Sequence, residues 1–156
     1  MKFEHLVEIN DPKNPLIQEL TRKQVWDGLV LRAESTKFFI PYLDECIITA
    51  RTPVGLSRRL RYGELIVTDQ VQLEVLHFVQ YDVAAQGEIP QSSLRMTIEE
   101  PEDGALFIRF TYDDGHGDAV DAENATYNEY RRSAYQEADI DTVRVIRELI
   151  EAGVLV

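Results

Sequence analysis

Residues 124–152 read NATYNEYRRSAYQEADIDTVRVIRELIEA, and this stretch decides the fold because its apolar and small side chains recur at steps of three and four. That spacing is the 3.6-residue period of an amphipathic helix. The expected buried stripe comprises Tyr127, Arg131, Ala134, Ala138, Thr142, Val145, Ile146, Leu149 and Ile150. Gly153 is a natural stop, since glycine readily adopts the left-handed conformation that ends a helix. The sequence therefore predicts one long helix from Asn124 to Ala152.

Before this helix, most apolar side chains follow a period of two, which is typical of β-strands buried on one face. The alternation begins at Phe3–Ile9 and resumes after residue 45. The later runs are Cys46–Arg51, Leu56–Tyr62, Glu64–Val75, His77–Val83, Ser92–Glu99 and Ala105–Asp113. Short breaks separate them, so they are expected to pair as successive antiparallel hairpins. With the first run they predict a sheet of seven strands.

Two short helices are expected between the first run and the other six. Thr21 and Gln24 have the spacing of a capping box, which marks the start of the first helix. Gly28 lies inside that helix, and close packing against another element is the best reason for a glycine there. Thr36–Ile40 predicts the second helix, which Pro41 closes. Because strands and helices are segregated along the chain, the order predicts an α+β fold.

Composition narrows the class of protein. The chain has 156 residues, which suits a single domain spanning 1–156, and its 44% hydrophobic and 28% charged residues are typical of globular proteins. Its formal net charge is −12, whereas nucleic acids and anionic membranes recruit basic surfaces, so we expect neither as a partner. The only cysteine, Cys46, fits a reducing and therefore cytoplasmic location. No apolar run approaches the length of a membrane span.

No compact catalytic motif is present. His5, His77 and His116 are the only histidines, and their spacing matches no zinc-binding pattern. The glycines form no phosphate-binding loop, and no serine lies in a nucleophile elbow. We therefore expect no metal and no cofactor, and we assign no catalytic residue. His5 falls on the inward side of the first strand, where a hydrogen-bonded core histidine is a simpler interpretation than a general base.

Four stretches resemble a known family. They are Met1–Asp11, Trp26–Ala33, Met96–Pro101 and Ser133–Thr142, and they are similar to the AtaL-like branch of the SRPBCC superfamily. Members of that superfamily share the START and birch-pollen-allergen-like helix-grip fold. The resemblance implies an antiparallel sheet curved around the C-terminal helix, with a hydrophobic cavity between them. Lipid carriers, polyketide aromatase/cyclases and hormone receptors all belong to the superfamily, so the fold alone does not choose a function.

Strand phase selects side chains that would face such a cavity. Arg58 shares the phase of Leu60, and on the next strand Asp69 shares the phase of Val67. An inward arginine and an inward aspartate are expected to pair, because buried charges are rarely left single. The pair is either an anchor for a polar group on an apolar ligand or a purely structural ion pair.

Aromatic and apolar side chains complete the predicted site. Tyrosines suit an aromatic ligand because they both stack and form hydrogen bonds. The half of the long helix from Tyr127 to Ala138 is expected to face the ligand, and the more aliphatic half from Thr142 to Ile150 is expected to close the core. The predicted ligand-binding residues are Arg58, Tyr62, Asp69, Tyr81, Met96, Phe110, Tyr112, Tyr127, Tyr130 and Ala134.

Two functions fit this pattern, and the sequence does not decide whether the chain is an enzyme. The first is binding of a small hydrophobic molecule, aromatic or polyketide-like, in the cavity. The second is an enzyme resembling polyketide cyclase/aromatases or dehydratases, which would act in the same cavity through its shape and a few polar groups. An interaction module whose cavity is filled by side chains is a third interpretation. A homodimer is left open as the assembly.

Overall fold

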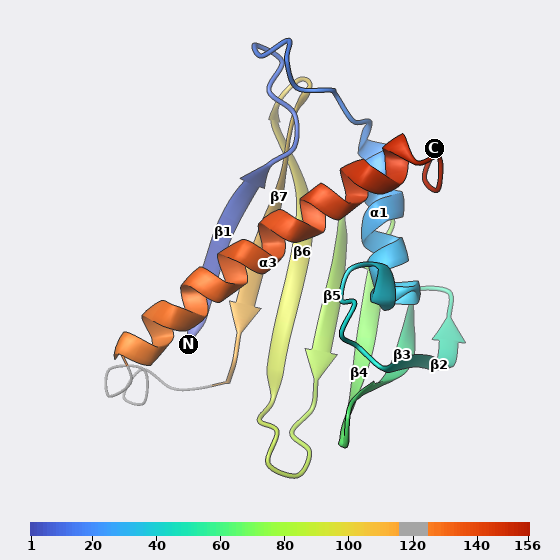
Figure 1. Ribbon diagram of the computed structural model, residues 1–156, viewed down its shortest axis with the longest axis vertical. Coiled ribbons are helices and arrows are strands. Elements are labelled where there is room, and N and C mark those ends of the chain that lie inside the picture. The colour runs from blue at the N-terminus through green and yellow to red at the C-terminus, as the bar shows by residue number, and fades with distance from the viewer. Residues whose placement is uncertain (116–124) are drawn as a thin grey trace.

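The computed structural model describes residues 1–115 and 125–156, and it contains a sheet with a long C-terminal helix across one face (Figure 1). The elements in chain order are β1 Lys2–Glu8, α1 Arg22–Glu34, the 3-10 helix η1 Thr36–Phe38, β2 Glu45–Thr52, β3 Gly55–Tyr62, β4 Leu65–Glu74, β5 Phe78–Val83, β6 Ser92–Glu102, β7 Ala105–Asp113 and α3 Ala125–Glu151. The predicted α+β helix-grip fold is confirmed. His116 and Asn124, the predicted first residue of the long helix, lie outside the described residues.

The sheet is an antiparallel meander with one strand added at its end. β2 to β7 pair in chain order, and β1 lies on the far side of β7, so the sheet order is β1-β7-β6-β5-β4-β3-β2. β1 pairs with β7 along its whole length, from Lys2 opposite Asp113 to Glu8 opposite Phe107. The predicted seven strands are therefore all present, and the N-terminal strand lies beside the last one.

Regular register in the middle of the sheet preserves the inward phases that the sequence predicted. β3 and β4 pair without a shift, which places Arg58 directly opposite Asp69. β6 is irregular instead, with a register shift between Glu99 and Glu102. It continues past Glu99, its predicted end, and includes Pro101. A bulge tolerates a proline there because that residue need not donate to the ladder.

α1 begins at the predicted capping box and packs closely against α3. The Thr21 hydroxyl accepts a hydrogen bond from the Gln24 backbone N–H, and the Gln24 side chain accepts one from the Thr21 backbone N–H. A Cβ added at Gly28 would lie 2.7 Å from Cγ1 of Ile146 on α3, so the predicted close packing at this glycine is confirmed. The second predicted helix, Thr36–Ile40, is only a short 3-10 turn, η1.

α3 runs diagonally across the sheet, and its C-terminal half closes the core (Figure 1). Val143 and Ile146 join the buried hydrophobic cluster formed with α1 and the sheet. Arg147, which lies outside the predicted buried stripe, donates to the backbone carbonyls of Ile9 and Gln18. This arginine therefore fastens the end of the helix to the link between β1 and α1.

The inner face of the first half of α3 is rotated from the predicted stripe. Asn128 and Asp139 are buried there, whereas Tyr127, Ala134 and Ala138 are exposed. The predicted stripe was wrong in this half because it assumed that the inward side chains would be apolar or small. Polar side chains can occupy such positions when each finds a partner on the sheet.

Candidate functional site

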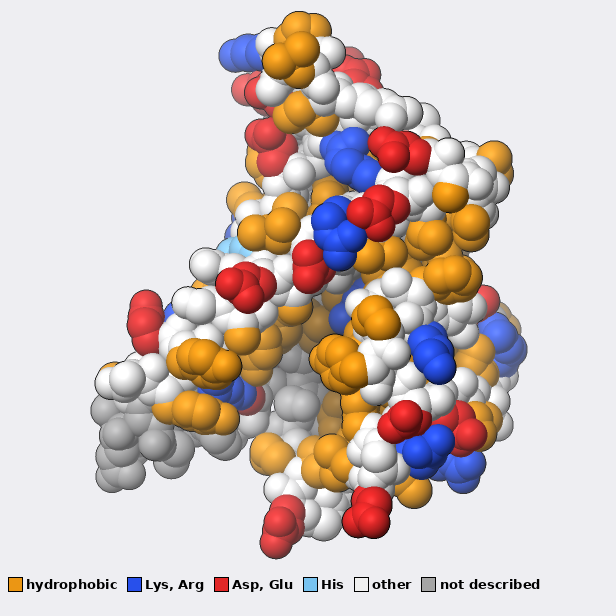
Figure 2. Space-filling view, in the orientation of Figure 1, with side chains coloured by type: hydrophobic (Ala, Val, Ile, Leu, Met, Phe, Trp, Pro, Cys, Tyr) orange, Lys and Arg blue, Asp and Glu red, His pale blue; other side chains and the backbone are white. Residues whose placement is uncertain are grey.

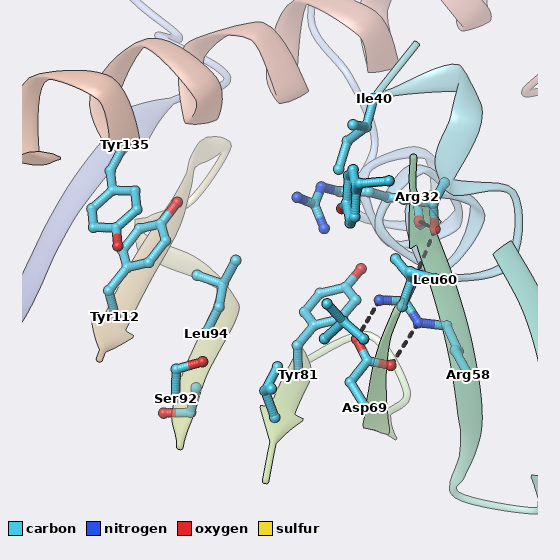
Figure 3. Close-up of a pocket in the computed structure, with 15 residues that line it drawn as sticks. Arg32, Ile40, Arg58, Leu60, Asp69, Tyr81, Ser92, Leu94, Tyr112 and Tyr135 are labelled. Carbon is cyan, nitrogen blue, oxygen red and sulfur yellow. Dashed lines mark hydrogen bonds and ion pairs between the residues drawn. The ribbon is translucent and has the colours of Figure 1, made fainter. Parts of the chain in front are cut away.

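A pocket of about 280 Å³ lies between the sheet and the first half of α3 (Figure 3). In the space-filling view the surface is hollowed between α3 and the segment around η1 (Figure 2). Strands β3 to β7 supply most of the wall, α1 and the segment after it supply one side, and α3 supplies Tyr135. Leu60, Val67 and Leu94 are among its apolar residues.

Arg58 and Asp69 form a bidentate ion pair at one side of the pocket (Figure 3). Nε of Arg58 lies 2.9 Å from Oδ1 of Asp69, and Nη2 lies 2.6 Å from Oδ2. The remaining Nη1 donates to the carbonyl of Ala33 and the hydroxyl of Thr36. Burial alone would lower the pKa of Arg58, but the hydrogen bond and charge of Asp69 raise that pKa above its ordinary value. The predicted pairing is confirmed, and its complete set of partners favours the structural interpretation.

A second polar cluster ties α3 to the sheet beside the opposite side of the pocket. Asp139 accepts a hydrogen bond from the Tyr112 hydroxyl, and its Oδ2 lies 2.6 Å from Nε2 of His5. Burial raises the pKa of Asp139, although hydrogen bonds from Tyr112 and His5 oppose that rise. Burial and the neighbouring Asp139 charge also raise the pKa of Tyr112. The prediction of a hydrogen-bonded core histidine at His5 is confirmed.

Aromatic rings line the pocket between these two clusters. Tyr112 and Tyr135 are stacked, with 4.1 Å between ring centroids and 10° between planes. Tyr81 lies between that stack and the ion pair (Figure 3), with Cζ of Arg58 4.9 Å from its ring centroid. Tyr62 also lines the pocket, and burial raises its pKa. A flat molecule would therefore meet aromatic surface on more than one side.

Half of the predicted ligand-binding residues line this pocket, namely Arg58, Tyr62, Asp69, Tyr81 and Tyr112. Met96 and Phe110 are fully buried in the hydrophobic core and do not line it. Tyr127, Tyr130 and Ala134 are exposed on α3, with Tyr127 61% and Tyr130 72% exposed, so the expectation that they face the pocket is corrected. The rotation of the helix explains these three positions. The binding role of the five lining residues stays a prediction.

Sequence reasoning missed Arg32, Tyr135 and Asp139. Tyr135 and Asp139 continue a series of three- and four-residue steps from Asn128 to Thr142, but the polar members of that series hid it. Arg32 lies three residues after Leu29 and four after Gly28, which are both buried, so the helical period places it on the inner face of α1. Its charge concealed that position, and its long side chain extends past the apolar surface into the pocket.

The described part of the chain offers few other reactive groups. Cys46 is half-buried, with its thiol sulfur 3.8 Å from the Thr36 hydroxyl. Among residues 1–115 and 125–156, no group of three or more His, Cys, Asp or Glu side chains is placed to hold a metal ion. No helix in those ranges has both the length and the apolar character needed to cross a membrane. The polar groups available to a ligand in the pocket are thus mainly arginines, tyrosines and serines.

Residues 7–153 match a family model described as AtaL, acetylaranotin biosynthesis cluster protein L. The chain belongs to the AtaL family. Every residue that lines the pocket falls within the matched range, so the pocket is formed by the AtaL region itself. A comparison with curated protein sequences finds no match.

Solved structures share the fold of this AtaL-family chain at low sequence identity. The Zhui aromatase/cyclase from Streptomyces sp. R1128 is 14% identical with a TM-score of 0.65, over 96% of this chain and 95% of that one. The di-domain aromatase/cyclase BexL of the BE-7585A biosynthetic pathway is 15% identical with a TM-score of 0.64; 95% of this chain is covered, but only 49% of BexL. Ara h 8.0201 is 12% identical with a TM-score of 0.55, over 94% and 98%. These similarities show a common fold.

The raised pKa of Asp139 predicts that the effect of Asp139→Asn on stability changes with pH. Because the folded-state pKa lies above the unfolded value of about 3.9, ionisation of Asp139 removes stability as pH rises between the two. Asparagine stays neutral and can still accept from Tyr112. Relative to the wild type, we expect the free energy of unfolding of Asp139→Asn to rise with pH, by at most about 1.4 kcal/mol per pH unit.

Urea unfolding at several pH values from about 3.5 to 7 measures this difference. The same comparison in a His5→Gln background removes the imidazole that shares the carboxylate. A difference that is independent of pH, or that falls as pH rises, would contradict the assignment of a raised pKa to Asp139.

Proposed function

We propose that this AtaL-family chain binds a small, mainly hydrophobic molecule with aromatic or polyketide-like rings in the pocket between the sheet and α3. The observation that carries the proposal is the aromatic wall formed by Tyr81, Tyr112 and Tyr135. Leu94 lies between Tyr81 and the stacked pair of Tyr112 and Tyr135 (Figure 3). Concave sites with apolar walls and a few polar groups are the usual form of small-molecule sites. The volume of about 280 Å³ lies near the lower end of the typical range of about 300–1,000 Å³, which suits a few rings rather than a long acyl chain.

The names of similar proteins support this class of ligand. The family description refers to a biosynthesis cluster, and two solved structures with this fold carry the name aromatase/cyclase. A ring-containing biosynthetic molecule is consistent with both. In this proposal residues 1–156 act as one ligand-binding domain.

Blocking the pocket tests the proposal. Leu94→Trp would fill the pocket, whereas Ile66→Trp adds the same ring at a half-exposed position on β4 outside it. We expect calorimetry to show saturable binding of 2-naphthol, a neutral two-ring molecule, to the wild type and to Ile66→Trp. Leu94→Trp should weaken binding by about tenfold or more, which corresponds to about 1.4 kcal/mol.

Native mass spectrometry of the purified protein provides a second readout. A molecule that co-purifies with the wild type should be absent from Leu94→Trp and present with Ile66→Trp. If the two variants bind 2-naphthol equally, the pocket is not the binding site and the proposal fails.

Catalysis in the same pocket, of the cyclase, aromatase or dehydratase type, is a second candidate function. The observation that favours it is the hydrogen bond from Tyr112 to Asp139, since burial raises the pKa of both groups and such groups often act in acid–base catalysis. Turnover of a linear poly-β-ketone separates the two functions. An enzyme would accelerate ring formation and lose that acceleration in Tyr112→Phe while still binding 2-naphthol. A binding protein would leave the poly-β-ketone unchanged.

A further inference from the structure

The pocket wall carries one positive charge, on Arg32, that forms no ion pair among the described residues. Its charged lining residues are Arg32, Arg58 and Asp69, and both carboxylate oxygens of Asp69 are bound to Arg58. Asp139, on α3, is hydrogen-bonded to Tyr112 and His5, and it interacts with the charge of Arg32 without forming an ion pair with it. Within residues 1–115 and 125–156, the side chain of Arg32 has no hydrogen bond and no ion pair. The residues that line the pocket therefore have a net charge of +1, which is carried by Arg32.

Two buried polar atoms beside the pocket also lack partners among the described residues. These are Nε of Arg32 and the hydroxyl oxygen of Tyr81. They belong to neighbouring side chains, because Cζ of Arg32 lies 5.2 Å from the Tyr81 ring centroid. Figure 3 shows Arg32 extending from α1 into the space between the ion pair and the tyrosine stack. Buried donors are normally paired, since an unpaired one has lost its hydration without compensation. A ligand oxygen would supply the acceptor that both groups lack.

We propose that the ligand of this pocket carries an anionic oxygen, as a carboxylate or an ionised phenol or enol, and that Arg32 and Tyr81 bind it. The inference rests on the proposed function and narrows its ligand class to ring-containing acids. The oxygen accepts hydrogen bonds from the Arg32 guanidinium and the Tyr81 hydroxyl, while the rings lie toward Leu94 and the tyrosine stack. Charge-assisted hydrogen bonds of this kind are stronger than neutral ones. Arg58 does not substitute for Arg32, because each of its guanidinium nitrogens already has an acceptor.

The negative charge of the whole chain affects which anions can reach Arg32. At a net charge of −12, the long-range field of the protein repels anions. Contacts inside the pocket must therefore outweigh that repulsion, and a partly buried charge is screened less than an exposed one. The site should thus favour acids with an apolar ring body over small free anions such as acetate.

Matched probes test the inference by calorimetry. 2-Naphthoate is compared with 2-naphthamide, which has the same rings and no charge, and with 2-hydroxy-1,4-naphthoquinone, which is ionised at its enol near neutral pH. We expect the wild type to bind at least one of the two anions more tightly than the amide, and to bind acetate undetectably. The preferred anion identifies whether the oxygen is a carboxylate or an enolate. Arg32→Met should weaken binding of that anion by about 10- to 100-fold and leave the amide unchanged.

Further variants separate binding from a structural role. Tyr81→Phe should weaken anion binding while preserving the ring. Arg144→Met removes the same charge from an exposed part of α3 and should not change affinity. The Arg32→Met variant should unfold at a temperature no lower than the wild type, because the substitution removes a cation that has no ion pair. Unfolding at a lower temperature would indicate a structural role for Arg32 and count against the inference.

If the amide binds as tightly as both anions, the proposal of an anion site is wrong and the proposed function stands. If none of the three ring compounds binds, both proposals fail.

Discussion

Asp69→Ala is expected to lower the free energy of unfolding by about 3–5 kcal/mol, because it leaves the Arg58 guanidinium buried without its counter-charge. The side chains of Arg58 and Asp69 are only 3% and 6% exposed, so water cannot replace the lost carboxylate without rearrangement of the pocket wall. Ala33 and Thr36 would still accept hydrogen bonds from Arg58, but both are neutral. Urea unfolding at neutral pH measures the change.

Two controls separate this charge effect from general damage to the sheet. Arg58→Met combined with Asp69→Leu removes both charges and should recover most of the loss, since buried ion pairs are often replaceable by apolar side chains of similar volume. Asp141→Ala breaks an exposed pair, with Arg144 at 3.3 Å, and should change stability by less than about 1 kcal/mol. If Asp69→Ala costs no more than Asp141→Ala, the ion pair does not stabilise the sheet as its burial implies.

Phe110→Ala should lower the free energy of unfolding by about 3–5 kcal/mol, the usual cost of truncating a core phenylalanine. Phe110 is fully buried on β7, opposite Met96 on one neighbouring strand and His5 on the other. Its ring also stacks on the His5 imidazole, with 5.6 Å between centroids. The sequence suggested Phe110 as part of a ligand wall, whereas its position in the core predicts a loss of stability without a loss of affinity. Urea unfolding and calorimetry with 2-naphthol measure the two quantities.

Phe107→Ala provides the matched control for this substitution. Phe107 is half-buried on the same strand, with the opposite phase to Phe110, so its truncation should cost about 1 kcal/mol or less. If Phe110→Ala abolishes 2-naphthol binding and leaves stability close to that of Phe107→Ala, the ring belongs to the ligand site rather than to the core.

The sheet was predictable from sequence because its strands follow one rule along most of their length. Inward and outward side chains alternate, and short breaks join neighbours, so Arg58 and Asp69 could be paired without any structure. The regular register of β3 and β4 then keeps that phase intact. The position of β1 beside β7 could not be predicted in the same way, because no short turn connects them and the paired residues lie 99 to 111 positions apart.

The pocket was only partly predictable because two of its walls depend on polar groups at helical positions. Asp139 lies outside the stripe predicted from the sequence, yet it faces the sheet because Tyr112 and His5 provide hydrogen bonds. Those partners lie on strands far away in sequence, and a helical period cannot reveal them. Arg32 was missed although it shares the phase of the buried Gly28 and Leu29, because a charged side chain at such a position was not counted with the apolar face.

The position of β1 has a consequence for how the protein folds during synthesis. Among the described strands β1 pairs only with β7, and His5 contacts Asp139, which lies 134 residues later in the chain. The first strand emerges from the ribosome long before either partner exists, with the inward side chains of Phe3 and Val7 uncovered. Contacts between residues so distant in sequence carry a high loop-closure entropy and form slowly. Closure of this side of the molecule is therefore a late step in folding, because it must wait until β7 and the middle of α3 have been synthesised.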